Sequence, residues 1–467
     1  MKRTMKRSRR TRRSGLNRNA TVRSRSKSFA LNEPWFYPVL AIALAAVLAA
    51  CGKGAGSTSA ANGAPAATSA SAPAANSAGA SAGETRGLSA GKIVIEGDAT
   101  LSIPGANPPF PGIEDGIKAR IARQNSEGGI NGRQIDYLGT LDDQASQPTL
   151  LTNITKAVLN NNAFAVGPIV TVAQLPTAFI AQNRVPVFGF GDSPGWCGQP
   201  YAMSFDGCLE SVNRGDDTTA ALVAQYLGGA KGKTYGLIFN DSQSAGLKVD
   251  AAAATAAGFS VCYQQAVVPL TPVSDYTPYV TPVMQKCAGG KGPDVMFVSV
   301  TGLQAELGII TDLRAAGYQG LIVTATYDPN LLKAPGAAAA LAGSVVIVYS
   351  VAPEQFSTPG LAQFKKDLTA IGAPTTGGFS YGELLGYAAA DFMIASLEHA
   401  GKSLTAQSLV AGMQQGYDYP GVAGFVTAAK YPSAYSQASP CGSLLKVSGG
   451  QFEPAVPLTC YHDITMP

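Results

Sequence analysis

The chain has 467 residues, with 34 basic and 30 acidic side chains and a formal net charge of +4. Twelve basic residues and one acidic residue lie in residues 1–50, so the remainder has 22 basic and 29 acidic residues. The rest of the chain is therefore acidic. The positive net charge of the whole sequence comes from residues 1–50 and is no evidence for a nucleic-acid partner.

The basic leader runs into an apolar segment, residues 39–50, that ends at Cys51. Its twelve residues are fewer than the roughly 20 that a membrane-spanning helix needs. A basic region, a short apolar core and small residues are typical of a secretory signal peptide, which we assign to residues 1–50. Residues 48–51 (LAAC) resemble the lipobox of bacterial lipoproteins, which implies cleavage before Cys51 and diacylation of its thiol. An ordinary signal peptide with a chance cysteine is the alternative.

Residues 52–90 are almost wholly Ala, Gly, Ser, Thr, Pro and Asn. Such a segment has too few large apolar side chains to offset its chain entropy, so it is predicted to be disordered. A flexible chain of about 40 residues has an r.m.s. span of roughly 35 Å. Residues 51–90 are therefore predicted to be a lipid-anchor cysteine and a tether between the membrane and a folded body.

Six cysteines remain if Cys51 carries lipid, and an even number in an exported chain favours disulfides. Sequence neighbours suggest three pairs, although six cysteines allow 15 pairings: Cys197–Cys208, Cys262–Cys287 and Cys441–Cys460. A metal site is not predicted, because no CxxC pattern occurs and the chain has only two histidines, His399 and His462. No cofactor is predicted, since neither a Walker A pattern nor a complete G-x-G-x-x-G after a strand occurs.

Short β-rich runs alternate with longer helical runs from residue 91 onwards. In the first half, strands are predicted at 92–96, 134–138, 163–166 and 185–190, and helices at 112–125, 147–160 and 172–182. In the second half, helices are predicted at 216–227, 247–257, 276–286, 303–316 and 383–400, and strands at 234–239, 261–268, 295–300, 321–324 and 345–349. This alternation predicts an α/β fold of two doubly wound lobes, each with its own parallel sheet.

Ligands of open α/β sheets bind outside the carboxyl ends of the strands. The loops at those ends are rich in Gly, Ser, Thr, Asp and Asn, and they cover residues 167–172, 189–194, 240–246, 301–304 and 325–330. Two lobes whose loops face each other form a cleft, which is the usual place for a small-molecule site. Aromatic side chains that are candidates to stack on a ligand there are Phe110, Phe190, Trp196 and Tyr327.

Residues 125–143 (NSEGGINGRQIDYLGTLDD) combine a helix end, two glycines and an Asn131-Gly132 turn before a strand. With Gly167-Pro168, residues 184–187 (RVPV) and residues 313–318 (LRAAGY), this segment resembles the type I periplasmic binding proteins, in particular the branched-chain amino acid receptors of ABC importers. The resemblance implies two lobes, joined by three crossovers, that hinge closed on a ligand. It assigns residues 91–213 and about 350–400 to the first lobe, and residues 214–345 and about 401–467 to the second.

The resemblance also implies ligand-binding positions. The first lobe is expected to hold a ligand carboxylate with Val170, Thr171, Asp192 and Ser193. Aromatic positions of the family fall near Ser244 and Thr301, and the acidic position that pairs with the ligand's ammonium falls near Thr326, Tyr327 and Asp328. The residue types of the amino-acid clamp are thus only partly matched, with Asp328 or Asp192 as the candidate counter-charge. An amino acid, a neutral amide and a carboxylic acid all stay open as ligands.

The function implied is capture of a small polar metabolite by a monomeric lipoprotein that delivers it to the permease and ATPase subunits of an ABC importer. A ligand-sensing surface lipoprotein and a purely structural one are alternatives. A serine hydrolase is a further alternative, because Gly378–Gly382 (GFSYG) matches G-x-S-x-G around Ser380 and both histidines lie downstream. The residues before Ser380 are a loop and not the buried strand that a nucleophile elbow requires, so no enzymatic activity is expected.

Overall fold

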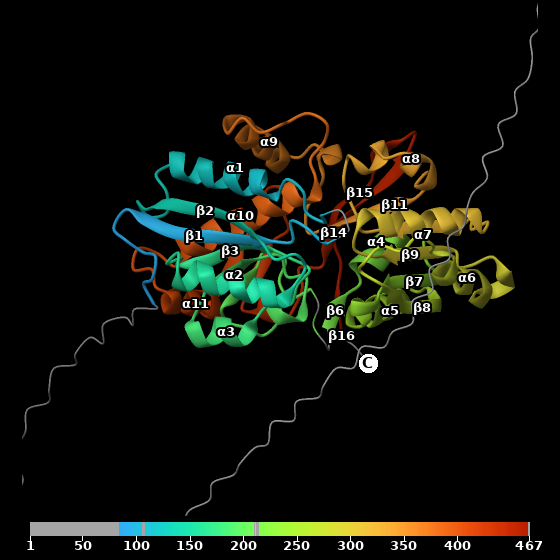
Figure 1. Ribbon diagram of the computed structural model, residues 1–467, viewed down its shortest axis with the longest axis horizontal. Coiled ribbons are helices and arrows are strands. Elements are labelled where there is room, and N and C mark those ends of the chain that lie inside the picture. Colours follow the sequence, from blue (N-terminus) through green and yellow to red (C-terminus); the bar gives the residue numbers. More distant parts are fainter. Residues whose placement is uncertain (1–83, 105–107, 210, 212–213, 466–467) are drawn as a thin grey trace, which may run out of the picture. The chain divides into compact units, whose positions relative to one another are not determined.

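The computed structural model describes residues 84–104, 108–209, 211 and 214–465, all within one compact unit (Figure 1). The predicted signal peptide, the lipidation of Cys51 and the tether up to residue 83 lie outside the described residues. Residues 84–90 correct the predicted tether, because they belong to the folded body. The Glu84 side chain is buried, and its carboxylate accepts hydrogen bonds from Arg184 Nη1 at 2.6 Å and from the backbone N–H of Gln407 at 2.7 Å.

The first sheet has the strand order β2-β1-β3-β4-β5, and all of its pairs are parallel. Its strands are β1 (Lys92–Ala99), β2 (Gln134–Asp142), β3 (Ala165–Val170), β4 (Val187–Gly189) and β5 (Ala202–Ser204). Its helices are α1 (Ile113–Ser126), α2 (Gln147–Leu159), α3 (Thr177–Asn183) and α10 (Tyr381–His399). Helices α1 and α10 lie on one side of this sheet and α2 and α3 on the other (Figure 1). Alternate residues of β1 point to opposite faces, so Ile93 and Ile95 join the core with α1 and α10, while Val94 packs with α2 and α3.

Helices α1 and α10 approach closely because glycine lies at their contact. A Cβ added at Gly116 would lie 2.1 Å from the carbonyl oxygen of Glu383, and one at Gly386 would lie 2.4 Å from that of Ile113. Neither position has room for a side chain. This pair of helices places the start of α10 next to the loop that precedes α1.

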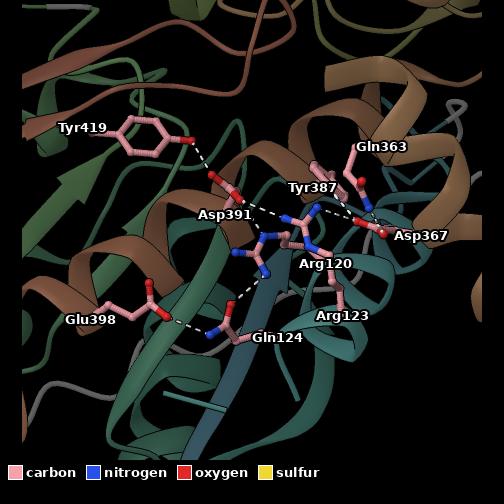
Figure 2. A network of polar contacts seen from close by, with 9 residues as sticks. All are labelled: Arg120, Arg123, Gln124, Gln363, Asp367, Tyr387, Asp391, Glu398 and Tyr419. Atoms are coloured by element: carbon pink, nitrogen blue, oxygen red, sulfur yellow. Dashed lines mark hydrogen bonds and ion pairs between the residues drawn. The ribbon is translucent and has the colours of Figure 1, made fainter. Parts of the chain in front are cut away.

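A buried ion-pair network joins α1 to α10 and to α9 (Pro359–Ala370) (Figure 2). Arg120 Nε lies 2.5 Å from Asp391 Oδ1, and Arg123 Nη1 lies 3.0 Å from Asp367 Oδ2. The Tyr419 hydroxyl donates to Asp391 Oδ2 at 2.9 Å. Because both carboxylate oxygens of Asp391 are bonded, the network ties α1, α9 and α10 to one another and to the segment after α10 that contains Tyr419.

The second sheet has the order β15-β14-β11-β10-β9-β7-β8. Its strands are β7 (Thr234–Asn240), β8 (Ser260–Val268), β9 (Val295–Ser299), β10 (Leu321–Thr324), β11 (Val345–Tyr349), β14 (Cys441–Ser448) and β15 (Gln451–Cys460). The first five pair in parallel, whereas β14 and β15 are antiparallel. The second sheet therefore has a parallel part of five strands, as predicted, and an antiparallel pair of strands at one edge that the sequence did not predict. Its helices are α4 (Thr218–Tyr226), α5 (Ser244–Ala256), α6 (Thr277–Lys286), α7 (Leu303–Ala315) and the short α8 (Ala337–Ala340).

The segment between α10 and β14 packs on the first lobe. It contains α11 (Ala406–Gln415), β12 (Tyr417–Tyr419) and β13 (Ala429–Tyr431). The Tyr431 hydroxyl accepts from the backbone N–H of Ser204 at 2.7 Å and donates to its carbonyl oxygen at 2.8 Å. This placement differs from the expected boundary, which put residues 401–440 in the second lobe, because these short elements carry their own contacts to β5 and α10.

The chain passes between the lobes three times, as expected for the fold. The passages lie between β5 and β7, between β11 and α9, and between β13 and β14. A small two-stranded sheet, β6 (Arg214–Asp216) with β16 (Asp463–Thr465), lies along the first passage. Among the described helices, none has both the length and the apolar composition needed to cross a membrane.

Three disulfides have the neighbour pairing that the sequence suggested. Cys197–Cys208 closes the loop around β5, Cys262–Cys287 joins β8 to the end of α6, and Cys441–Cys460 joins the open ends of β14 and β15. The first lies next to Leu209, where the chain leaves the first lobe. Each bridge restricts a short stretch of chain near a point where a strand meets a loop.

Candidate ligand-binding site

A cavity of about 410 Å³ lies at the carboxyl ends of strands from both sheets. This volume falls in the range of roughly 300–1,000 Å³ that small-molecule sites occupy. From the first lobe, residues 108–111, Val172, Phe190, Asp192 and Tyr381 line it. The second lobe contributes residues 299–303 from the end of β9 onwards, residues 325–328 after β10, Phe239 and Tyr349 at strand ends, and part of α5.

Asn240, at the end of β7, organises the second-lobe wall. Its buried side chain accepts a hydrogen bond from the backbone N–H of Thr301 at 2.6 Å and donates to the carbonyl oxygen of Val268 at 3.1 Å. Gly302 follows with φ 96°, a left-handed conformation that glycine adopts without strain. Together these two residues turn the chain from β9 into α7, so that the helix begins at the cavity.

Aromatic side chains form much of the cavity wall. They come from both lobes: Phe110, Phe190, Phe239, Tyr327, Tyr349 and Tyr381. Hydrogen bonds fix the three tyrosines. Tyr327 donates to Glu354 Oε2 at 2.7 Å, Tyr381 donates to the carbonyl oxygen of Tyr349 at 3.3 Å, and the Tyr349 hydroxyl bonds to that of Thr219. Rings held in this way present a preformed apolar surface to a ligand.

The charged side chains of the cavity wall are all acidic: Asp192, Asp216, Asp250 and Asp328. Burial raises the pKa of Asp216 to about 6, although hydrogen bonds from Thr218 favour the charged form. The residue as a whole is half-buried. The Asp328 carboxylate accepts from the backbone N–H of Asn330 at 2.7 Å. No Lys, Arg or His occurs among the described residues that line the cavity.

Glu306 lies behind this wall, in the first turn of α7. Its side chain is 1% exposed, and burial raises its pKa to about 8. Within the described part of the chain neither carboxylate oxygen has a hydrogen-bond partner of normal geometry, although Thr324 and Thr326 lie close enough to favour the charge slightly. At neutral pH the Glu306 side chain is therefore mostly protonated.

Of the nine ligand-binding residues predicted from the sequence, five line the cavity: Asp192, Thr301, Thr326, Tyr327 and Asp328. Val170 is fully buried in β3, and the Thr171 hydroxyl donates to Asp143 and accepts from the backbone N–H of Ala173. Ser193 is buried beside the wall, and Ser244 is exposed at the start of α5. These four do not line the cavity, and direct contact of any of the nine with a ligand stays a prediction.

Several lining residues were missed by the sequence reasoning, notably Asp216, Phe239, Asp250 and Tyr349. Phe239 and Tyr349 lie at the carboxyl ends of predicted strands. The rule that ligands bind at the carboxyl ends of strands, here called the strand-end rule, could therefore have identified both. Asp216 and Asp250 lie on segments predicted to be helical, where nothing in the sequence showed which face would meet the cavity. Of the aromatic candidates, Trp196 is buried in the first-lobe core instead.

Ser380, the serine of the G-x-S-x-G match, caps helix α10. Its hydroxyl accepts from the backbone N–H of Glu383 at 3.1 Å and donates to the carbonyl oxygen of Pro111, and the Glu383 side chain bonds back to the backbone N–H of Ser380. His399 stacks on Tyr417 and His462 contacts Asp217. The hydroxyl is thus engaged in a capping box, and neither histidine is among its partners.

The sequence model of the family described as "Periplasmic binding protein" matches residues 99–451. The chain belongs to this family. The match runs from the end of β1 to the start of β15 and so includes both walls of the cavity. A search of curated proteins gives no significant match to this periplasmic binding protein.

Solved structures share its fold at low sequence identity. A fatty acid ABC transporter substrate-binding protein from Thermomonospora curvata is 18% identical, with a TM-score of 0.63 over 80% of this chain and 94% of that one. A branched-chain amino acid transporter substrate-binding protein from Streptococcus pneumoniae, in complex with isoleucine, is 16% identical, with a TM-score of 0.62 over 79% and 99%. A solute-binding protein from R. palustris, in complex with 4-hydroxybenzoate, is 16% identical, with a TM-score of 0.60 over 80% and 98%.

Proposed function

We propose that this protein is the extracytoplasmic substrate-binding component of an ABC importer and that it captures a small metabolite in the cavity between its lobes. The observation that carries the proposal is a cavity lined from both lobes at the carboxyl ends of both sheets. Relatives of the same fold are named as transporter substrate-binding proteins, which supports the importer role. The permease and ATPase subunits would be separate partners.

Capture follows from the way the chain joins the two lobes. Three connecting segments allow the lobes to approach each other, and a ligand that contacts both walls favours the closed arrangement. Closure excludes water, so hydrogen bonds between the ligand and the cavity wall become stronger. Phe190 and Tyr381 of the first lobe and the polar loop after β9 of the second lobe then supply opposite sides of one binding surface.

The ligand proposed from the sequence is an amino acid or a related amide or carboxylate. Support comes from relatives that bind isoleucine and 4-hydroxybenzoate. A ligand-sensing lipoprotein is the second candidate, because the same cavity serves a sensor equally well. We propose no enzymatic activity, since Ser380 is used as a helix cap.

We further propose that the protein works as a monomer, anchored on the outer face of the membrane by a lipid on Cys51. Replacing Cys51 with Ser is expected to move the protein from the membrane fraction to the soluble fraction, because it removes the only thiol that the lipobox offers. Fractionation of cells that produce either form measures this. Tight membrane association of the Cys51→Ser protein would contradict the lipid anchor.

The test of binding is a thermal-shift panel on the mature chain, carrying Cys51→Ser to keep it in solution. Amino acids, amides, short carboxylates, amines and sugars make up the panel. A compound at a hundred times its Kd stabilises the folded state by about 2.7 kcal/mol, which raises Tm visibly. We expect at least one such compound. Stabilisation by none of the compounds would contradict the proposed function.

A blocking variant locates the site. Thr301→Trp places a large ring at the cavity wall while keeping the backbone hydrogen bond to Asn240, so it is expected to abolish the shift. Thr255→Trp, at an exposed position of α5 outside the cavity lining, is the matched control and is expected to keep it. A shift that survives Thr301→Trp would place the ligand elsewhere.

A further inference from the structure

The balance of charge in the cavity distinguishes classes of ligand. Four carboxylates line it, and no basic side chain does among the described lining residues. Residues 105–107, 210, 212 and 213, which are close to lining residues in the sequence, are Gly, Ala, Asn, Glu, Val and Asn, and none of them is basic. Arg214 and Lys248 are also close in the sequence, but neither belongs to the lining. The ammonium of Lys333 donates to Asn330 Oδ1 at 2.8 Å, but this lysine is exposed and outside the lining.

Helix ends offset only part of this charge. Helices α5 and α7 begin at the cavity, and each helix N-terminus carries the equivalent of about half an elementary positive charge. Two such ends amount to about one positive charge, against the two carboxylates of Asp216 and Asp328 alone. The mostly protonated Glu306 adds little, while Glu354 behind Tyr327 is a further acidic group. The cavity is therefore electrostatically negative on balance.

Six aromatic rings line the same cavity. The faces of Tyr and Phe rings attract cations, and carboxylates add direct charge pairs. Aromatic walls combined with acidic groups suit an organic cation that has an apolar body. A carboxylate ligand would find no basic partner on the described wall and would face repulsion from Asp216 and Asp328.

We infer that the ligand is an organic ammonium ion, with its cationic group held by Asp216 and Asp328 and its apolar part against the aromatic wall. The inference rests on the proposed capture of a small metabolite between the lobes, and it replaces the ligand classes proposed from the sequence with an organic cation. It differs from the carboxylate ligands open at the level of sequence, because the described cavity wall offers acidic side chains and no basic ones.

Three six-carbon compounds with a positive, a neutral and a negative head group test the inference: hexylammonium, 1-hexanol and hexanoate. Their affinities for the mature Cys51→Ser chain are measured by isothermal titration calorimetry at pH 7, with isoleucine and 4-hydroxybenzoate alongside. We expect hexylammonium to bind at least about tenfold more tightly than hexanol, and hexanoate to bind most weakly. Thr301→Trp is expected to remove the hexylammonium signal.

Variants that remove one negative charge separate an electrostatic role in ligand choice from a role in fold stability, because only the electrostatic role changes the affinities for a cation and an anion in opposite directions. Asp328→Asn is expected to weaken hexylammonium about tenfold or more and to strengthen hexanoate, while Asp241→Asn, at an exposed carboxylate outside the lining, changes neither. Tighter binding of hexanoate, 4-hydroxybenzoate or isoleucine than of hexylammonium would overturn the inference and leave the proposed function intact. Binding of none of the five compounds would also overturn it, and the proposed function would then depend on the broader thermal-shift panel.

Discussion

Replacing Asp391 with Ala is expected to lower the free energy of unfolding by about 3–5 kcal/mol. The Asp391 carboxylate accepts from Arg120 Nε at 2.5 Å and from the Tyr419 hydroxyl at 2.9 Å, and Arg123 Nη2 lies 3.5 Å away (Figure 2). The Arg120 side chain is only 8% exposed. Removing its partner leaves a buried guanidinium without a counter-charge, which costs much more than the loss of an exposed ion pair. Chemical denaturation followed by circular dichroism measures the change.

The exposed pair Lys92–Asp136 is the matched control, because its nitrogen–oxygen distance is also 2.5 Å while its side chains are 53% and 41% exposed. Asp136→Ala is expected to cost at most about 1 kcal/mol. Burial alone then accounts for the difference between two pairs of the same length. Equal effects of the two substitutions would contradict a structural role for the network that joins α1, α9 and α10.

Glu306→Gln is expected to change how stability depends on pH. The ordinary pKa of this carboxyl, 4.5, applies in the unfolded chain, and burial raises it to about 8 in the folded protein. Between these values the folded state binds more protons than the unfolded state, so the free energy of unfolding falls as pH rises. The loss amounts to about 5 kcal/mol over the whole interval. Glutamine is close in shape and does not titrate, so the variant should lack this loss.

The measurement is the free energy of unfolding of both proteins at pH 5, 7 and 9. Asp206 and Asp216, whose pKa values burial raises to about 7 and about 6, titrate in the same interval in both proteins. The difference between the proteins therefore isolates Glu306. The variant is expected to gain stability relative to the parent as pH rises, whereas exposed Glu127→Gln should not. Parallel pH profiles for Glu306→Gln and the parent would contradict a buried, protonated carboxyl.

Local patterns predicted the regular part of the fold well. Apolar runs such as residues 295–300 mark the buried parallel strands, and the alternation with helices indicates two lobes. The hairpin β14–β15 and the mixed second sheet were not predicted, because antiparallel pairing of β14 with β11 depends on contacts about a hundred residues apart. Residues 401–440 were assigned to the wrong lobe for the same reason, since long-range contacts such as those of Tyr431 and Tyr419 place them and no local pattern does.

The candidate site was predicted at the level of loops rather than of side chains. The strand-end rule led to Thr301 and residues 326–328, which line the cavity. It could not show that the Thr171 hydroxyl is taken up by Asp143. Nor could it show that Asp216 and Asp250 come together with the loops of the first lobe. Both residues are acidic, which bears directly on the choice of ligand. Their position at the cavity depends on the folded arrangement of both lobes.

The most direct test of the central claim is hydrogen–deuterium exchange of the mature chain, with and without the compound that gives the largest thermal shift. The account predicts slower exchange in lining segments of both lobes, residues 108–111 and 190–192 in the first and residues 299–303 and 325–330 in the second. Helices α2 and α6, which are outside the lining, should change little. Slower exchange confined to one lobe, or found only away from these segments, would contradict ligand capture between the two lobes.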